Sequence, residues 1–268
     1  MPAESAFVAQ LRLYPIKALN PVMVDRAIIL PSGALAGDRA FAIMDTEGKF
    51  VNGKRNANIH TLRALFDLNT MSITLSGQHA DPETFHIEQE RDRLEAWLGK
   101  YFGFPVQIVQ NLDLGFPDDT VSPGPTIVST ATLEAIATWF LDLTVEEIRL
   151  RFRANIEVAG VPPFWEDRLF GTEDELVHFQ IGEVQFMGVN PCQRCVVVTR
   201  NPETGVAYPN FQKTFVAKRQ DALPDWTNRS RFNHFFRLAV NTRVPVSEQG
   251  KAVHIGDEVK IYANDRRD

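Results

Sequence analysis

Apolar and polar residues alternate in short runs along the first part of the chain. Residues 7–14 and 24–30 follow this pattern, residues 40–45 show it after a Gly-Asp turn, and residues 72–75 repeat it. A period of two places every second side chain on the same face of a strand, so each run is predicted to be a β strand. The beginning of the chain is therefore expected to be all β.

Two segments show the spacing of a helix instead. Residues 91–101 carry one apolar face, and Gly103 follows as an end signal. Further on, Ser129 or Thr130 is expected to cap a helix that continues to Leu141. The core-facing residues are predicted to be Leu94, Trp97, Leu98 and Tyr101 in the first helix, and Leu133, Ile136, Ala137 and Phe140 in the second.

Further strands are predicted at residues 127–128, 155–158, 177–186 and 258–262. A loop rich in Pro and Gly at residues 116–125 separates two halves, which predicts one domain over residues 1–115 and a second over residues 116–268. Short strands separated by turns, with few helices, favour a mainly β fold with some α structure. We therefore expect an α+β, barrel-like architecture and not a doubly wound sheet.

The two cysteines of the chain stand three residues apart, in a run Asn-Pro-Cys-Gln-Arg-Cys that ends at Cys195. A disulfide between Cys192 and Cys195 would close a very short loop and stabilise little. A zinc site needs further ligands at suitable spacing, which the six scattered histidines do not provide. Residues 196–199 are β-branched and predict a strand, whereas a thioredoxin-like pair precedes a helix. Two interpretations remain: buried apolar cysteines, or a thiol used in soft-metal or redox chemistry.

Composition limits the classes of function. The 268 residues, 44% of them hydrophobic, are enough to bury a core without disulfides. A net charge of -6 provides no overall basic field for nucleic acid, and no apolar run approaches the ~20 residues of a membrane helix. The beginning of the sequence lacks the basic-then-apolar order of a secretory signal. We therefore expect a cytoplasmic protein that binds neither nucleic acid nor membrane.

Residues of the kind that bind anions are predicted at strand ends and at one helix N-terminus: Lys17, Arg39, Ser129, Thr130, Arg153 and Asn155. For each basic residue taken alone, a solvated charge or an ion pair is the alternative. The sequence contains neither a Gly-rich phosphate loop nor a dinucleotide fingerprint. A nucleotide is therefore not the favoured anion.

Several of these motifs coincide with those of a known family. The matching segments are residues 13–17 with their Tyr-Pro-Ile-Lys, 37–39, 127–133, 153–155, 182–184, and the cysteine run at 191–195 with the Asn-Pro-Glu-Thr-Gly at 201–205. On these residues the chain resembles the MOSC (molybdenum cofactor sulfurase C-terminal) superfamily, in the form with an N-terminal β-barrel domain. Within that superfamily it is most similar to the mitochondrial amidoxime-reducing component and its bacterial relatives.

The resemblance implies a MOSC-associated β-barrel domain over residues 1–115, a MOSC domain over residues 116–268, and a pyranopterin molybdenum cofactor between them. Cys195, the second cysteine of the motif, would be the metal ligand and catalytic residue, because a metal held by a dithiolene needs one further soft ligand. The branch often has a small polar residue after the lysine, where this chain has Ala18. By position, the implied cofactor-binding residues are Lys17, Arg39, Ser129, Thr130, Arg153, Asn155 and Arg194.

The activity implied by the resemblance is reduction of N-hydroxylated small molecules by a molybdenum-cofactor oxidoreductase. The sequence has no cysteines for an iron–sulfur cluster and no flavin or NAD fingerprint, so electrons are expected from a separate protein. An acidic redox partner is expected to dock on a basic rim near Lys213, Lys218 and Arg219, and the chain is expected to be a monomer. One alternative is a sulfur-carrier or cofactor-maturation protein that holds a persulfide on Cys195. Another is a cofactor-binding module without turnover.

Overall fold

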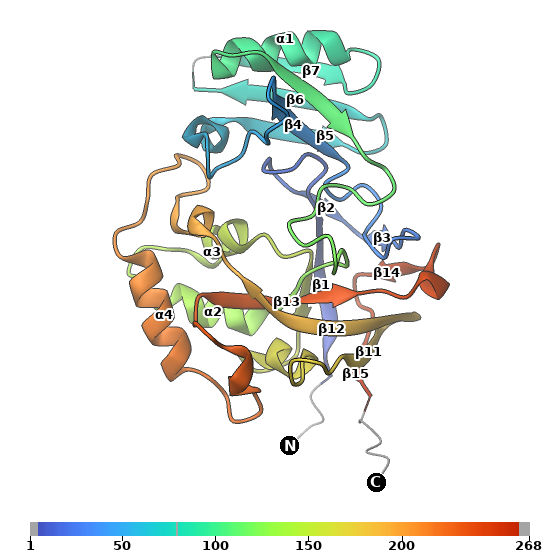
Figure 1. Cartoon of the computed structure of the whole chain (residues 1–268), viewed down its shortest axis with the longest axis vertical. Helices are drawn as coiled ribbons and strands as arrows, with labels where there is room; N and C mark the ends of the chain where they lie inside the picture. Colours follow the sequence, from blue (N-terminus) through green and yellow to red (C-terminus); the bar gives the residue numbers. More distant parts are fainter. Residues whose placement is uncertain (1–4, 79, 263–268) are drawn as a thin grey trace.

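The computed structural model describes residues 5–78 and 80–262, and much of this chain is β structure. An eight-stranded sheet forms the larger part of the molecule (Figure 1). Its order is β15 (Val259–Ile261), β11 (Val177–Ile181), β12 (Val184–Gln193), β13 (Arg237–Arg243), β9 (Ile127–Ser129), β10 (Ile156–Ala159), β1 (Phe7–Leu13) and β2 (Val22–Val24). The β9–β10 pair is parallel and the other described pairs are antiparallel. The predicted α+β class is confirmed.

The large sheet curls back on itself. The Val8 backbone N–H donates to the Asp257 carbonyl at 2.9 Å, and the Val259 N–H donates to the Ala6 carbonyl at 2.8 Å. These bonds place the beginning of β1 beside the beginning of β15, at the far edge of the same sheet. The curled sheet encloses an apolar core, as a barrel does, with side chains that include Val8, Leu11, Val158, Phe179, Ile181, Phe186 and Val240.

A smaller lobe lies above the sheet in Figure 1. It contains the β4–β8 pair, the three strands β5, β6 and β7, and helix α1, which share a second apolar core. The bounds are β4 (Phe41–Asp45), β5 (Arg63–Asp67), β6 (Ser72–Gly77), β7 (Ala80–His86), α1 (Arg91–Phe102) and β8 (Val106–Gln110).

Strands from the beginning of the chain also belong to the larger part of the molecule. β1 and β2 lie in the large sheet, and β3 (Arg26–Ile28) pairs with β14 (Ala252–His254). The smaller lobe is thus inserted between β3 and the later strands. The division of the sequence at residue 115 stays a prediction, and the backbone pairs across it.

Three helices pack against one side of the sheet: α2 (Thr130–Ala137), α3 (Val145–Phe152) and α4 (Phe211–Asp221). They share a third core, rich in aromatic rings, in which Phe211 stacks on Phe140 with ring centroids 4.5 Å apart. Short 3-10 turns connect the elements at η1 (Ala57–Thr61), η2 (Trp165–Leu169), η3 (Val196–Thr199), η4 (Arg229–Arg231) and η5 (Val246–Glu248). Across the described residues, no helix has the length and apolar character that crossing a bilayer requires.

Most of the predicted elements are confirmed, but two predicted single strands are wrong. Residues 24–30 are interrupted at Asp25, because β2 pairs with β1 whereas β3 pairs with β14. Residues 177–186 form a hairpin, in which the chain turns at Gly182 between β11 and β12. In both cases the local alternation continues through a point where the hydrogen-bonding partner changes.

The helix predicted to reach Leu141 ends at Ala137 instead. The N–H groups of Trp139 and Phe140 bond three residues back, to the Ile136 and Ala137 carbonyls, so the last turn tightens. This tighter turn keeps Phe140 in the core and leaves Leu141 fully exposed.

The strand predicted at residues 196–199 is also wrong, because η3 occupies this segment. Arg151 of α3 donates from Nη1 to the Val198 and Arg200 carbonyls, at 3.0 and 2.6 Å. These carbonyls are therefore unavailable to a neighbouring strand. The backbone of residues 196–199 forms a single 3-10 turn instead. Strand propensity was overridden by a tertiary contact.

Candidate active site

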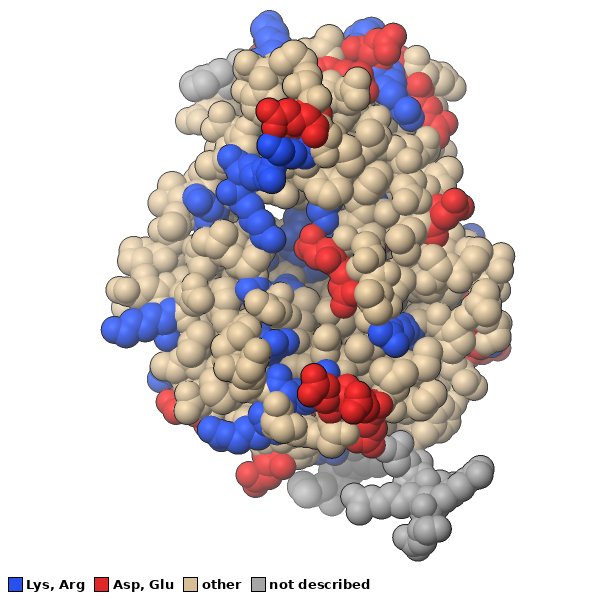
Figure 2. Space-filling model, viewed as in Figure 1, with Lys and Arg blue, Asp and Glu red and all other residues tan. Residues whose placement is uncertain are grey.

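A cavity of about 600 Å³ opens between the smaller lobe and the large sheet. Figure 2 shows Lys and Arg side chains gathered around a hollow near the middle of this face. Lys and Arg outnumber Asp and Glu by eight to four in the lining. The basic residues are Lys17, Arg39, Lys54, Arg151, Arg153, Arg194, Arg200 and Arg237, and the acidic ones are Asp38, Asp118, Asp119 and Glu203.

One buried ring supports two of these guanidinium groups. Tyr14 is fully buried, with the guanidinium carbon of Arg153 4.0 Å and that of Arg39 5.1 Å from its ring centroid. Arg39 also pairs with Asp38, whereas Arg153 donates to the Leu19 carbonyl at 2.8 Å. Burial, followed by the charge of Arg39, lowers the pKa of Arg153, although Tyr14 opposes this. An anion bound between these groups would relieve their repulsion.

Lys17 approaches the same cavity with its ammonium already engaged. Its Nζ donates to the Phe116 carbonyl at 2.8 Å and to Asp118 Oδ1 at 2.6 Å. Desolvation alone would raise the pKa of the Asp118 carboxyl, but Lys17 and then Arg39 lower it overall. The Asp118 carboxylate thus occupies the position beside Lys17 that would attract an anionic ligand.

Strained backbone positions cluster along this wall. Ala18, Arg39 and Arg153 have φ values of 74°, 50° and 52°, and all three line the cavity. Left-handed conformations are unfavourable for residues with a Cβ and tend to occur at functional sites. Here the conformation turns the chain sharply just where each side chain enters the cavity.

The expected hydrogen-bonding residues divide into two groups. Asn155 lines the cavity, and its Oδ1 accepts from the Thr126 N–H at 3.3 Å and from Arg39 Nη1 at 3.4 Å. Ser129 and Thr130 do not line it. The Ser129 hydroxyl is buried and caps α2 through the Thr132 N–H, and the Thr130 hydroxyl donates to a buried glutamate. Their expected contact with a bound anion has no support in this geometry, because both hydroxyls serve the fold.

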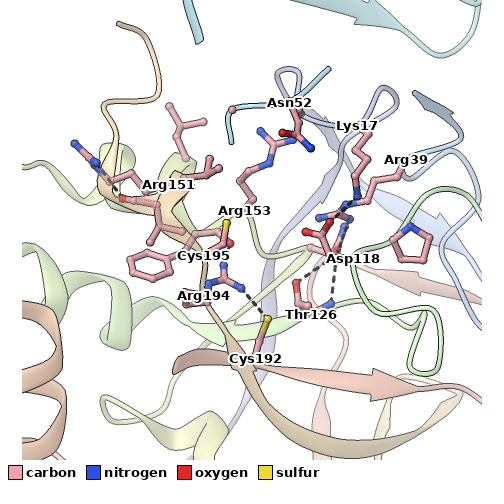
Figure 3. A pocket seen from close by; sticks show the side chains of 18 of the residues that line it. Lys17, Arg39, Asn52, Asp118, Thr126, Arg151, Arg153, Cys192, Arg194 and Cys195 are labelled. Carbon is pink, nitrogen blue, oxygen red and sulfur yellow. Dashed lines mark hydrogen bonds and ion pairs between the residues drawn. The ribbon is translucent and has the colours of Figure 1, made fainter. Parts of the chain in front are cut away.

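The cysteine segment forms another wall of the cavity. Cys192 lies near the end of β12 and Cys195 at the beginning of η3, and both are free thiols with partial exposure. Two buried apolar cysteines are therefore the wrong interpretation. Figure 3 shows both sulfur atoms facing the cavity with Arg194 between them. Arg194 Nη1 lies 2.9 Å from Cys192 Sγ, and its Nη2 donates to the Phe152 carbonyl.

The smaller lobe reaches the cysteine segment at Gly53. A Cβ at this position would lie 2.5 Å from His60 Nε2 and 3.2 Å from Val197 Cγ1, so a larger residue would require the His60 ring to shift. Burial, followed by the charge of Arg200, lowers the pKa of His60 to about 4. The imidazole is therefore neutral at pH 7.

Sequence patterns did not indicate several of the cavity residues: Asn52, Lys54, His60, Asp118, Thr126, Asn190, Arg200, Arg237 and Asn241. The Asn-Gly-Lys turn at residues 52–54 is a local signal for a basic loop. The others have ordinary local sequences, and packing brings them together. In the described chain, His, Cys, Asp and Glu form no group of three or more arranged to hold a metal ion.

Comparison with known families agrees with this arrangement. Residues 5–104 match the MOSC N-terminal beta barrel domain, and residues 126–260 match the MOSC domain. The chain belongs to the MOSC family. In this MOSC chain the cavity lies where residues from both matched segments meet, because Lys17, Arg39 and Lys54 come from the first and the cysteine segment from the second.

Named relatives of this MOSC chain fall into two groups. Mitochondrial amidoxime-reducing component 1 of Homo sapiens is 27% identical, over 74% of this chain and 67% of that protein. Mitochondrial amidoxime reducing component 2 of Bos taurus is 26% identical, over 74% of this chain and 68% of that protein. Molybdenum cofactor sulfurase of Caenorhabditis briggsae is 28% identical, over 96% of this chain and 36% of that protein. The MOSC chain thus spans about a third of the length of that sulfurase.

Proposed function

We propose that this protein is a molybdenum-cofactor-dependent oxidoreductase that reduces N-hydroxylated small molecules with electrons from a separate redox protein. One observation carries the proposal: the free thiol of Cys195 faces a cavity whose other walls present Lys17, Arg39 and Arg153. This combines a soft metal ligand with an anion-binding wall. The names of the amidoxime-reducing relatives supply the substrate class.

The residues present fit a pyranopterin cofactor in their chemistry. Such a cofactor carries a phosphate, for which guanidinium and ammonium groups are the preferred partners. Arg153 has no carboxylate partner among the described residues, so its charge is available to an anion. The metal of such a cofactor is held by the sulfur atoms of the pterin and would take one further thiolate, which Cys195 would supply. The bound cofactor would supply two-electron chemistry at a metal with a position open to substrate.

The chain's own residues would bind and orient these groups. Lys17, Arg39 and Arg153 would hold the phosphate, with Tyr14 supporting two of the three charges. Asn155 Oδ1 accepts a hydrogen bond from Arg39 Nη1 at 3.4 Å and so helps to orient the Arg39 side chain. Arg194 Nη1 donates to Cys192 Sγ at 2.9 Å and so holds this thiol at the cavity wall.

The overall reaction balances with two electrons and two protons. The N–O bond of the N-hydroxylated substrate breaks, one proton goes to nitrogen, and the other goes to the hydroxyl oxygen, which leaves as water. The redox partner supplies both electrons, and solvent supplies both protons. No residue of the chain is assigned as the proton donor.

The decisive experiment uses protein produced in a host that makes the cofactor. We expect about one molybdenum per chain by elemental analysis, and reduction of benzamidoxime to benzamidine with reduced viologen as electron source. Cys195→Ser should abolish this activity and release the metal, because the hypothesised protein ligand is lost. Cys192→Ser is the matched control and should retain much of both.

Equal loss in the two cysteine variants would contradict this assignment and favour a dithiol mechanism. Protein that contains the metal but stays inert with every reductant would contradict the reductase proposal as a whole.

A second function is supported by the relatives named molybdenum cofactor sulfurase. In this case Cys195 would carry a persulfide and transfer its outer sulfur during cofactor maturation. Mass spectrometry of the purified protein distinguishes the two, because a persulfide adds one sulfur atom to Cys195 whereas a metal-bound thiolate does not.

One residue of the expected partner-docking surface needs correction, because Arg219 is buried. Lys213, Lys218 and Arg219 do not line the cavity, and Arg219 is buried in an ion pair with Asp167. We propose that an acidic redox protein docks on the basic side chains of the cavity, which include Lys54. We also propose that the protein is a cytoplasmic monomer that acts on a small-molecule substrate.

A further inference from the structure

Four arginines of the cavity have no acidic partner. In the described chain, no Asp or Glu oxygen comes within the 4.0 Å of an ion pair for Arg153, Arg194, Arg200 or Arg237. By contrast, Lys17, Arg39 and Arg151 each pair with a carboxylate. Arg153 belongs to the proposed phosphate site. The other uncompensated charges need a different explanation.

Strand pairing places the backbones of two of these arginines close together. Gln193 of β12 pairs with Arg237 of β13, and the Arg194 N–H donates to the Phe236 carbonyl at 3.0 Å. Both side chains approach Cys192: Arg194 Nη1 lies 2.9 Å from its Sγ, and Cys192 interacts electrostatically with Arg237. Both line the cavity beside Cys192.

Neutral acceptors hold both guanidinium groups. Arg194 donates to Cys192 Sγ and to the Phe152 carbonyl, and Arg237 donates at 2.9 Å to the Pro191 carbonyl and to Asn233 Oδ1. A guanidinium has five N–H donors, so each keeps three unused. Burial lowers the pKa of Arg237; Cys192 opposes this shift, and the charge of Arg231 adds to it. Positive charge is thus in excess at this end of the cavity.

In Figure 3, Arg194 lies by the two sulfur atoms, with Lys17 and Arg39 on the other side of the view. We propose that Arg194 and Arg237 form a second anion-binding subsite, which takes a carboxylate on the substrate. This inference rests on the proposed reductase function and narrows its substrate class to N-hydroxylated compounds that carry a carboxylate. Paired guanidinium donors suit the two oxygens of a carboxylate.

The test uses cofactor-loaded protein and two matched ligand pairs. The substrates are 4-carboxybenzamidoxime and its neutral 4-carboxamide, and the ligands for calorimetry are the two corresponding amidines, which cannot be reduced further. We expect wild type to prefer the carboxylate about tenfold or more, both in kcat/KM and in Kd. Raising the salt concentration to about 1 M should narrow this preference.

Variants locate the preference within the cavity. Arg237→Met should reduce it to less than about threefold, whereas Arg237→Lys, which keeps the charge, should retain most of it. Arg229→Met removes an equal charge from an exposed position outside the cavity and should leave the preference intact. Thermal melts of all three variants establish that they are folded.

Two results would overturn the subsite: equal affinity of wild type for the charged and neutral amidines, or an unchanged preference in Arg237→Met. The subsite proposal is also overturned if neither amidine binds. Failure of the reductase proposal is separate, because it is seen as lack of turnover of both amidoximes, while calorimetry needs no electrons and still decides the subsite.

Discussion

Single residues set the chemistry of the cavity wall, and Tyr14 is central among them. Its ring is fully buried, and the guanidinium groups of Arg39 and Arg153 lie over it. Partly desolvated guanidinium groups that repel one another are stabilised by aromatic faces and by anions. The wall is therefore preorganised for a negatively charged ligand before that ligand arrives.

The strained backbone at Ala18 leads to a prediction about stability. Its φ of 74° is unfavourable for a residue with a Cβ, so Ala18→Gly should stabilise the protein by about 0.5–1 kcal/mol. This corresponds to a rise in melting temperature of about 2–4 °C per kcal/mol in a chain of this size. Ala217→Gly, in the exposed interior of α4, is the matched control and should lower the melting temperature, since glycine is unfavourable in a helix. A loss of stability in Ala18→Gly would show that the methyl contacts outweigh the strain.

A second prediction at this scale concerns Glu166, which is 1% exposed. Burial, followed by the charge of Asp167, raises its pKa from 4.5 to about 7. The unfolded chain releases this proton at a lower pH than the folded protein does. The stability linked to Glu166 is therefore fully present below pH 4.5 and is lost as pH rises through about 7, by about 3 kcal/mol in total.

Urea unfolding between pH 4.5 and 8 measures this effect. Glu166→Gln is nearly the same size and cannot ionise, so its stability should fall less over that range than that of wild type. Parallel pH profiles for the two proteins would contradict the assignment.

At the scale of elements, the contact between β12 and η2 holds the cysteine segment in place. Gly188 of β12 packs directly on the Leu169 carbonyl, and a Cβ at Gly188 would overlap that oxygen. Because the obstacle is backbone, Gly188→Ala should destabilise the protein by about 3 kcal/mol or more. Gly48→Ala is the control, as it has a positive φ but no atom within 4 Å of the added Cβ, and should cost only about 1 kcal/mol. Denaturant midpoints of the two variants provide the comparison, and similar values would show that β12 can move away.

At the scale of the whole molecule, the cavity exists because two separately packed cores meet across it. Lys54 and His60 belong to the smaller lobe, whereas Arg153 and Cys195 belong to the part built on the large sheet. A ligand bound by residues of both parts stabilises the folded protein by mass action. Cofactor binding should therefore stabilise the contact between the two parts.

Electron supply is predicted at this scale too. The sequence contains no nucleotide fingerprint or cluster motif, so the purified protein should reduce benzamidoxime with reduced viologen but not with NADH alone. The measurement compares benzamidine formed with each reductant under anaerobic conditions. Protein without cofactor, mixed with viologen, is the control for direct chemical reduction. NADH-driven turnover by the single purified chain would refute the need for a redox partner.

The sequence by itself determined the elements whose signals are local. The α+β class, the helix ending at Gly103 and the Ser129 cap of α2 follow from periodicity and capping chemistry, which act over a few residues. The cysteine motif, Lys17, Arg39 and Arg153 were likewise visible in the chain, because their residue types carry the chemistry.

Tertiary structure alone decided where those groups meet. Spacing does not encode that Arg237 pairs beside Gln193, or that Arg151 takes the carbonyls that turn residues 196–199 into η3. Ser129 illustrates the opposite case, since a correct local cap turned out to face the core and not the cavity. The physical reason is that strand partners and buried ion pairs join residues far apart in sequence, and the free energy of those contacts outweighs local propensity.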